Sequence, residues 1–204
     1  MKIKQALKKF WHLVWKDDSL KGWIISLIVI FVFVKFIFFP TLNLVTGTKL
    51  PLMVVESCSM YHQRDLFTNF DNWWKLKGEQ YSTYIIDKSD FQKFSLKNGF
   101  NKGDIMFAVG VKPGNLKIGD IIIFNADQYH PIIHRIIEIK KDNNGYVFST
   151  KGDNNNGQLS VEKNIQSDQI ISKAVLKIPY LGWTKLIFFD WKNSADQRGF
   201  CKQN

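Results

Sequence analysis

The sequence is poor in cysteine and contains no loop of the kind that binds nucleotide phosphates. Of its 204 residues, two are cysteines, Cys58 and Cys201. Two cysteines cannot build a disulfide scaffold, and this pair lacks the spacing of a zinc site. Neither a glycine-rich phosphate loop nor a dinucleotide-binding fingerprint occurs. The common nucleotide-dependent enzymes are therefore excluded as first interpretations.

Acidic residues are also in short supply. The chain carries 28 lysines and arginines against 18 aspartates and glutamates, a net charge of +10, which suggests nucleic acid or anionic lipid as a partner. Much of the excess lies in residues 1–21, where six lysines accompany only Asp17 and Asp18. The remainder is mildly basic, as a solvated surface would be, so no nucleic-acid partner is expected. Apolar residues at 45% and charged residues at 23% exclude a disordered tail and a bare membrane bundle.

A continuous apolar run extends from Gly22 to Phe39, directly before Pro40. At ~1.5 Å per residue, a helix of this length spans roughly 27 Å, about the thickness of the hydrocarbon layer. Its single charge, Lys35, lies near one end, where the side-chain stem can carry the ammonium to the interface. The run fits a cleaved signal peptide or a buried core helix less well. We expect residues 22–40 to be one uncleaved transmembrane signal anchor.

The lysines near this run set its expected orientation. Four of them precede it, and the nearest basic residue beyond it is Lys49; the four are Lys8, Lys9, Lys16 and Lys21. The positive-inside rule then keeps the N-terminus in the cytoplasm and exports residues 41–204 across the cell membrane or an equivalent export membrane. Residues 1–21 are expected to be a basic cytoplasmic segment, with an amphipathic helix at 3–15 lying on the inner leaflet.

After residue 48 the pattern changes to short apolar runs separated by turn signals. Six runs are expected to be strands, at 50–55, 105–109, 121–124, 132–139, 146–150 and 174–178. Because no long helices come between them, the sequence predicts a mainly β fold, an antiparallel barrel-like domain over residues 41–185. Residues 61–102 interrupt this rhythm and are interpreted as an aromatic-rich insertion with a small core of its own. Residues 186–204 are expected to form a C-terminal tail.

Three weak signals for catalysis occur in a fixed order along this domain. Ser57 and Ser59 follow the first strand, His134 lies within a later strand, and Asp153 lies in the turn after the next one. Taken singly, each is more typical of a turn or of a structural residue. Taken together, they could supply a nucleophile, a general base and a carboxylate that orients the base.

Strand alternation makes a further prediction for residues 132–139. It places His134 on the same face as its neighbours at 132, 136 and 138, and Arg135 on the opposite face with 133, 137 and Ile139.

The ordered set of motifs resembles a type I signal peptidase of the archaeal and endoplasmic-reticulum branch. The resemblance rests on the apolar anchor, the Ser-x-Ser-Met box, strands launched from Gly-Asp pairs, an Ile-His-Arg strand, Lys-Gly-Asp-Asn at 151–154 and Ile-Pro-Tyr-Leu-Gly-Trp at 178–183. It covers residues 22–60 and 103–183. It implies that Ser59 is the nucleophile, His134 the general base and Asp153 the acidic partner. It also implies that Ser57 helps to hold the oxyanion, and that no metal or organic cofactor takes part.

The chain departs from the family pattern at three places. Cys58 stands between the serines where the family usually has glycine, and Tyr61-His62 follows Met60 in place of an acidic residue and proline. Leu159 occupies the position of a second aspartate, for which Glu162 is a nearby substitute. Cys58 is also a rival nucleophile to Ser59. Because adjacent residues of an extended strand point opposite ways, only one of the two can face His134, and Ser59 is favoured.

The expected function is removal of signal peptides from exported preproteins by a membrane-anchored serine endopeptidase. Its expected partners are preprotein signal peptides, the lipid bilayer and the protein-export machinery. The alternative is a catalytically impaired, membrane-tethered β domain that binds exported chains or a partner through residues 61–102.

Overall fold

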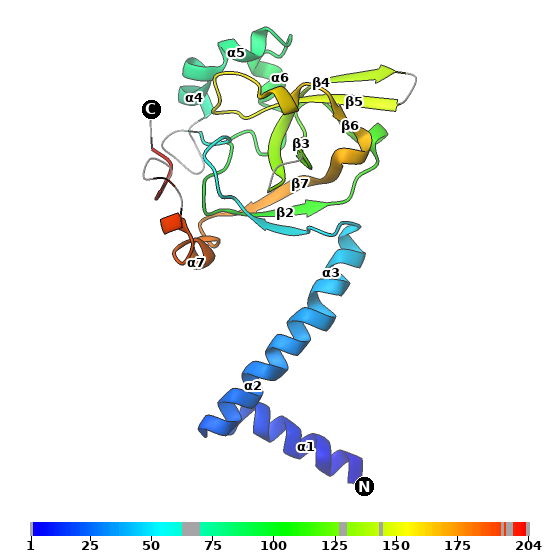
Figure 1. The fold of residues 1–204 in the computed structure, drawn as a ribbon, viewed down its shortest axis with the longest axis vertical. Helices are drawn as coiled ribbons and strands as arrows, with labels where there is room; N and C mark the ends of the chain where they lie inside the picture. The colour runs from blue at the N-terminus through cyan, green and yellow to red at the C-terminus, as the bar shows by residue number, and fades with distance from the viewer. Residues whose placement is uncertain are drawn as a thin grey trace. The chain divides into compact units, whose positions relative to one another are not determined.

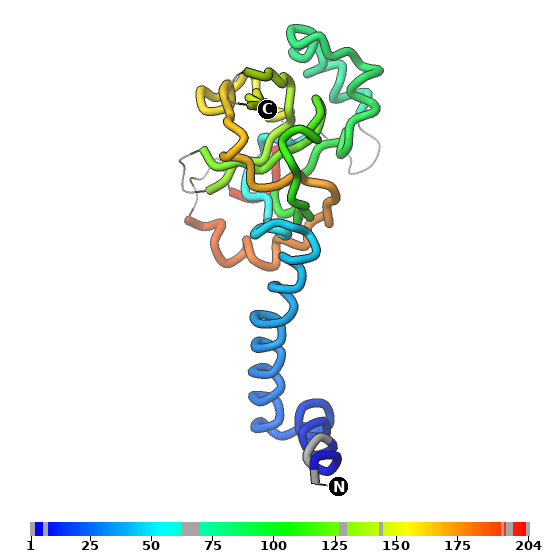
Figure 2. The backbone as a smooth tube through the Cα atoms, turned by 90° about the vertical axis from the view of Figure 1, so that its right-hand side faces the viewer, coloured from blue at the N-terminus to red at the C-terminus, as the bar shows by residue number. Residues whose placement is uncertain are grey.

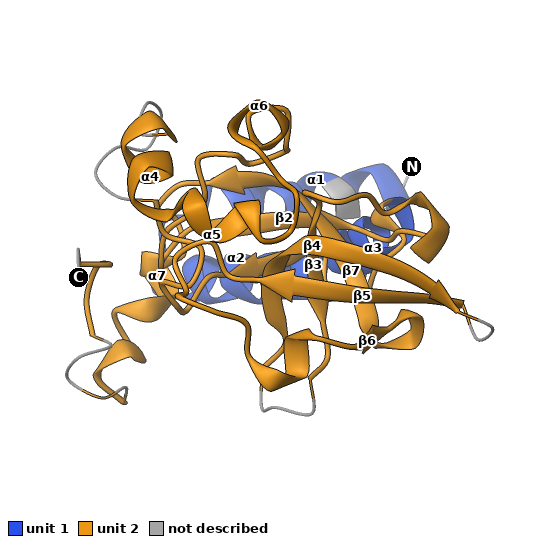
Figure 3. Ribbon diagram, turned by 90° about the horizontal axis from the view of Figure 1, so that it is seen from above, with its two compact units in different colours: residues 1–45 blue, residues 46–204 orange. Residues whose placement is uncertain are grey.

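The computed structural model describes residues 2–62, 70–126, 130–142, 145–192, 194 and 198–202. The chain divides into two compact units, residues 1–45 and 46–204, which Figure 3 shows in different colours.

The first unit contains a short helix and a long apolar one. Helix α1 is Lys2–Trp15, and a continuous helical run follows at Leu20–Thr46, made of α2 (Leu20–Phe33), a π-helical turn η1 (Val34–Phe38) and α3 (Phe39–Thr46) (Figure 1). The π-helical turn ends two residues before Pro40, whose missing N–H interrupts the ordinary hydrogen-bond ladder. The run has 27 residues and includes an 18-residue window with a mean hydropathy of 2.6, so it is long and apolar enough to cross a membrane. It contains the whole expected span 22–40 and continues past Pro40.

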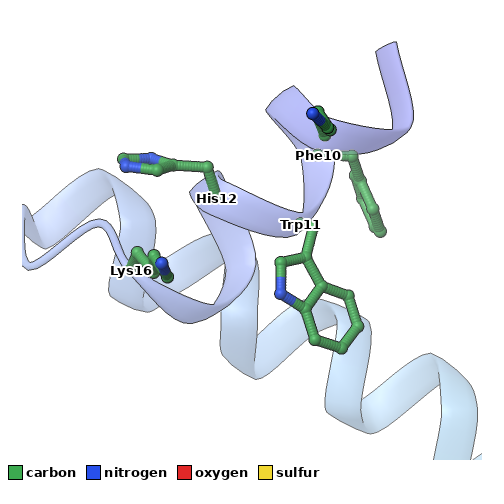
Figure 4. Close-up of a pocket in the computed structure, with 5 residues that line it drawn as sticks. Phe10, Trp11, His12 and Lys16 are labelled. Atoms are coloured by element: carbon green, nitrogen blue, oxygen red, sulfur yellow. The ribbon is translucent and has the colours of Figure 1, made fainter. Parts of the chain in front are cut away.

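Helix α1 has the amphipathic character expected of residues 3–15. Trp11 and Trp15 are exposed, whereas Val14 is buried, and the Ser26 hydroxyl of α2 donates to the Val14 carbonyl at 2.6 Å. A shallow hollow of about 650 Å³ lies on α1, lined by aromatic and basic side chains (Figure 4): Lys8, Phe10, Trp11, His12 and Lys16. This surface contains no paired catalytic groups, and it is suited to an interface between water and lipid.

The second unit is built on one antiparallel sheet, so the predicted mainly β fold class is confirmed. Its seven strands follow the order β1-β2-β7-β3-β4-β5-β6. Their bounds are β1 Leu52–Val54, β2 Ile105–Val109, β3 Ile121–Phe124, β4 Ile132–Asp142, β5 Gly145–Lys151, β6 Ile165–Gln166 and β7 Ile170–Ile178. All six expected runs contain strands, and the short β6 was missed because two residues carry no periodicity.

Central strand β3 separates two apolar cores. Ile121 and Ile123 pack with Met60 and Met106 on one face, whereas Ile122 packs on the other face against residues of β4 and β5. Alternating side chains of one strand thus fill both cores, which explains why β3 is apolar at every position.

A bulge in β4 changes the predicted alternation. The register against β5 shifts between Ile136 and Glu138. Ile139 consequently packs in the same core as Ile132 and Ile136, so its expected placement on the opposite face was wrong.

The segment expected to be an insertion forms three short helices. These are α4 (Phe70–Lys77), α5 (Glu79–Ser82) and α6 (Lys88–Phe91), which Figure 2 shows grouped together in teal and green. Residues 63–69 of this segment lie outside the described residues. The helices enclose a third apolar core around Trp73, Tyr81 and Phe91, to which β4 contributes Ile137.

The remaining helices are short. They are η2 (Pro113–Asn115), η3 (Ser160–Glu162), η4 (Ser167–Gln169), α7 (Trp183–Leu186) and η5 (Asp190–Lys192). Near the C-terminus, Phe200 packs against Trp183, and Cys201 forms a disulfide with Cys58.

Candidate functional site

The two serines expected to act in catalysis lie together after β1. Their hydroxyl oxygens, Ser57 Oγ and Ser59 Oγ, are 3.1 Å apart. Both residues line an open cavity of about 920 Å³, and His134 lines the same cavity. The structure therefore brings three of the four predicted site residues to one place.

A turn after β5 holds the backbone around Ser59. The Asn154 N–H donates to the Ser59 carbonyl at 2.7 Å, and the Asn154 side-chain amide donates to the Cys58 carbonyl at 3.1 Å. The Asp153 N–H points at the Met60 sulfur, 3.3 Å away. Three consecutive residues around the expected nucleophile thus depend on this turn.

Gly152 shows how closely the histidine approaches this backbone. A Cβ atom added at Gly152 would lie 2.9 Å from the Ser59 carbonyl oxygen and 2.9 Å from His134 Nε2. Both distances are too short for a carbon contact, so only glycine lets the turn pass between the histidine and the serine. His134 Nε2 and the Ser59 carbonyl oxygen therefore both border the position of Gly152.

His134 is buried in β4, and its other ring nitrogen contacts a carboxylate. His134 Nδ1 is hydrogen-bonded to Glu162 Oε1. Glu162 is fully buried in η3 and accepts two further hydrogen bonds, from the Thr150 hydroxyl at 3.2 Å and from the Leu159 N–H at 2.6 Å. Glu162, three residues after Leu159, thus places a buried carboxylate against His134.

Asp153 occupies a different position from the one expected. Its carboxylate is fully buried and bonded to Arg135 Nη2 at 2.7 Å, His62 Nε2 at 2.8 Å and the Tyr81 hydroxyl at 2.7 Å. Within the described part of the chain, no contact joins it to His134. The reason is the strand geometry: Asp153 turns toward the Arg135 face of β4, opposite to the face that carries His134.

The charges around Asp153 keep it ionised. Burial by itself would raise the pKa of Asp153, but the positive charge of Arg135 and the hydrogen bond from His62 outweigh it. The pKa consequently lies well below its usual range. The pKa of His62 is lowered from its ordinary value, because burial disfavours the charged ring more than Asp153 favours it. The network therefore pairs one permanent cation with one permanent anion and keeps His62 neutral.

Cys58 is not a free thiol. It forms a disulfide with Cys201, with the two Cα atoms 5.6 Å apart. A thiol engaged in a disulfide cannot act as a nucleophile, so the alternative of Cys58 catalysis is wrong for this state of the protein.

Sequence reasoning missed most of the second network. Arg135 had been assigned only a strand face, and His62 had been noted only as a departure from the family pattern. No local signal distinguishes them, because their partners lie far away in sequence. Among the described residues, no group of three or more histidine, cysteine, aspartate or glutamate side chains is arranged to hold a metal ion.

Comparison with known proteins points to one group. No family model matches the chain. It is 30% identical over 104 residues to the signal peptidase complex catalytic subunit SEC11C of Homo sapiens, covering 48% of this chain and 54% of that protein. The corresponding sec11 subunit of Dictyostelium discoideum is 31% identical over 104 residues, covering 48% of this chain and 58% of that protein.

A third relative matches over a shorter stretch at higher identity. The signal peptidase complex catalytic subunit SEC11 of Eremothecium gossypii is 40% identical over 63 residues, covering 30% of this chain and 37% of that protein. The matches thus span about half the length of the first two relatives and less of the third. Over about half of its own length, this chain is a homologue of the catalytic subunits of the signal peptidase complex, and its resemblance to type I signal peptidases is confirmed.

Proposed function

We propose that this protein is a membrane-anchored serine endopeptidase that removes signal peptides from exported preproteins. One observation carries the proposal: Ser59 and His134 line the same cavity, and a buried carboxylate, Glu162, contacts the far nitrogen of His134. The homology with catalytic subunits of the signal peptidase complex supports the same reaction.

The hydrogen bonds at Glu162 indicate which nitrogen of His134 carries the proton. Glu162 accepts hydrogen bonds from Thr150 and Leu159 and acts as an acceptor at His134 as well. His134 Nδ1 then carries the proton, and Nε2 presents its lone pair toward the Ser59 side. Glu162 thus orients the base and stabilises the imidazolium that forms, which is the role that the sequence assigned to Asp153.

The proposed reaction proceeds through an acyl-enzyme. Ser59 Oγ bonds to the scissile carbonyl carbon while its proton passes to His134 Nε2. The imidazolium returns this proton to the leaving amine as the carbon–nitrogen bond breaks. Water then repeats the sequence on the ester: it gives a proton to Nε2, attacks the carbonyl carbon and releases the new carboxyl terminus with Ser59 restored.

Ser57 is suited to stabilise the oxyanion. Its hydroxyl lies 3.1 Å from Ser59 Oγ, close to where the carbonyl oxygen of a bound peptide would carry negative charge. A hydroxyl donor at this distance, together with the Ser59 N–H, would act on charge that develops only in the transition state.

The edge of the sheet offers a place for an extended substrate. Strand β1 lies at one end of the strand order, so one of its sides has no partner strand within the sheet. Leu52 and Val54 of β1 line the cavity that contains Ser59. A signal peptide segment could add to this edge as a further strand, with small side chains near the scissile bond. The Cys58–Cys201 disulfide supports an oxidising, extracytoplasmic location for this unit.

The membrane and the export machinery are the proposed surroundings of the enzyme. The helix Leu20–Thr46 would anchor it, with the N-terminus in the cytoplasm as the lysine bias indicates. The relatives are named as subunits of a complex, which supports a partner within the export machinery.

The test is cleavage of a preprotein by the detergent-solubilised chain, with Ser59→Ala and Cys58→Ala beside it. We expect the wild type and Cys58→Ala to cut at one site and Ser59→Ala to lose activity by about 10³-fold or more. Cleavage by Ser59→Ala at the wild-type rate would refute the assigned nucleophile. A wild-type chain that cuts no preprotein, but binds exported chains through residues 61–102, would favour the alternative of a binding domain.

A further inference from the structure

The turn Gly152–Asn156 contacts the backbone of the proposed nucleophile, Ser59. Side chains from residues 61–102 contact this turn in their own right. Within the turn, the Lys151 ammonium donates to the carbonyls of Gly152 at 3.1 Å and Asn155 at 2.7 Å. Burial lowers the pKa of Lys151 to about 8. These contacts shape the turn, but none of them attaches it to the surrounding domain.

The inserted helices supply one attachment at the tip of the turn. Lys77, in the last turn of α4, reaches out of the insertion with its ammonium. It donates to the Asn154 carbonyl at 3.3 Å and to the Asn156 side-chain oxygen at 2.8 Å. Asn154 is the residue whose N–H holds the Ser59 carbonyl at 2.7 Å. A single residue, Asn154, therefore connects the insertion to the backbone of the proposed nucleophile.

Two further attachments meet at Asp153. His62, at the start of the insertion, bonds Asp153 Oδ2 at 2.8 Å, and Tyr81 of α5 bonds Asp153 Oδ1 at 2.7 Å. The His62 ring stacks on Trp73 with ring centroids 3.7 Å apart and planes 6° from parallel. Both His62 and Trp73 are almost fully buried, so the aromatic core of the insertion fixes the direction of the bond to Asp153.

The insertion also packs against the cation that neutralises Asp153. The Arg135 guanidinium lies 4.7 Å from the centre of the Phe91 ring and donates to the carbonyls of Ser95 and Leu96 at 3.0 and 3.1 Å. Residues of the insertion therefore satisfy donors of Arg135 that Asp153 does not. Without these two carbonyls, the buried guanidinium would keep Asp153 but lose two of its hydrogen bonds.

We propose that the described residues of the insertion, 61–62 and 70–102, are a positioning clamp: through His62, Lys77 and Tyr81 they fix the turn Gly152–Asn156 and thereby the backbone of Ser59. The inference rests on the proposed peptidase function and assigns His62 and Lys77 as positioning residues for its nucleophile. The clamp acts on the geometry of Ser59 and leaves recognition of the substrate to the cavity. Its loss should lower kcat and leave KM nearly unchanged.

The experiment compares point variants of the full chain in detergent. Lys77→Met removes the ammonium at a half-buried surface site, and Lys75→Met makes the same change on the exposed side of the same helix as a matched control. His62→Phe keeps an aromatic ring against Trp73 but removes the donor to Asp153, whereas His62→Gln restores a side-chain N–H donor. Each variant is measured for kcat and KM on a preprotein, for thermal unfolding, and for the rate at which a small fluorophosphonate labels Ser59.

We expect Lys77→Met and His62→Phe to lower kcat roughly 10-fold to 100-fold at similar KM, because small misplacements of a reacting group have costs of this size. Fluorophosphonate labelling should slow in parallel, His62→Gln should recover much of the loss, and Lys75→Met should match the wild type. The proposal is refuted if the folded Lys77→Met and His62→Phe variants keep kcat and labelling within about twofold of an active wild type. If the wild type itself neither cuts nor labels, the peptidase function fails first, and the clamp fails with it.

Discussion

Two histidines in this protein each contact a buried carboxylate, but they differ in their access to the cavity that contains Ser59. His134 contacts Glu162 and lines the cavity that contains Ser59. His62 contacts Asp153 but stacks on Trp73 in the core of the insertion. The carboxylates differ as well, because Asp153 is neutralised by Arg135, whereas Glu162 is held by the neutral donors of Thr150 and Leu159.

This comparison shows that a histidine–carboxylate pair is not by itself an active site. His134 lines the cavity in which the proposed substrate would bind, and among the described residues its carboxylate partner forms no ion pair with a lysine or arginine, which suits the histidine to accept a proton in the proposed reaction. At the second pair, Arg135 supplies the compensating charge, so His62 is free to stay neutral and structural.

The largest expected effect concerns the proposed catalytic pair, His134 and Glu162. Glu162→Gln keeps the size of the side chain but lets the amide face His134 with a donor, which favours the wrong tautomer. We expect kcat to fall about 10³-fold to 10⁴-fold with little change in KM. Glu138→Gln, on the same strand as His134 but half exposed, is the control and should retain activity. A Glu162→Gln enzyme with wild-type kcat would remove Glu162 from the mechanism.

A change at the structural pair, His62 and Asp153, should lower the free energy of unfolding. Asp153→Asn leaves the Arg135 guanidinium fully buried without its counter-charge, for which a loss of about 3–5 kcal/mol in the free energy of unfolding is expected. Urea unfolding of the full chain in detergent measures this loss. If stability is unchanged and kcat alone collapses, Asp153 is the catalytic partner of the histidine after all, and the contrast between the two pairs is lost.

The smallest effect is the response of the structural pair to acid. The pKa of His62 is lowered by burial, so below about pH 6.5 the unfolded chain binds more protons than the folded one, and stability falls as the pH decreases. The pKa of Asp153 lies well below its usual range, so the stability that it contributes is present above about pH 4 and is lost only in stronger acid. Thermal unfolding at pH 7.5 and pH 5 should show a larger loss for the wild type than for His62→Phe. Equal losses in the two proteins would mean that folding leaves the pKa of His62 unchanged.

Local sequence patterns were sufficient to predict the apolar helix and the strands. The apolar run at 22–39 is recognisable because nearly every position is apolar on all faces of a helix, and it lies within the helix Leu20–Thr46. The strand runs are recognisable because alternation and turn residues are properties of neighbouring positions. The alternation failed only at the bulge between Ile136 and Glu138, where a shift in pairing with β5 changes the face of Ile139.

Local sequence patterns could not predict which side chains contact the site residues. Which carboxylate reaches His134 depends on where η3 folds back against β5, and Glu162 and Asp153 are equally plausible on a linear chain. Cys58 and Cys201 are separated by 143 residues, and only the folded C-terminal segment brings them together.

The sequence by itself determined the apolar anchor, the β class of the second unit, and Ser57, Ser59 and His134 as candidate residues, because these depend on short-range periodicity and motif order. The tertiary structure decided that Glu162 contacts His134, that Asp153 pairs with Arg135 and His62, and that Cys58 forms a disulfide. The physical reason is that a buried charge takes the partner that the fold brings within hydrogen-bond distance, and proximity in space is set by the whole chain.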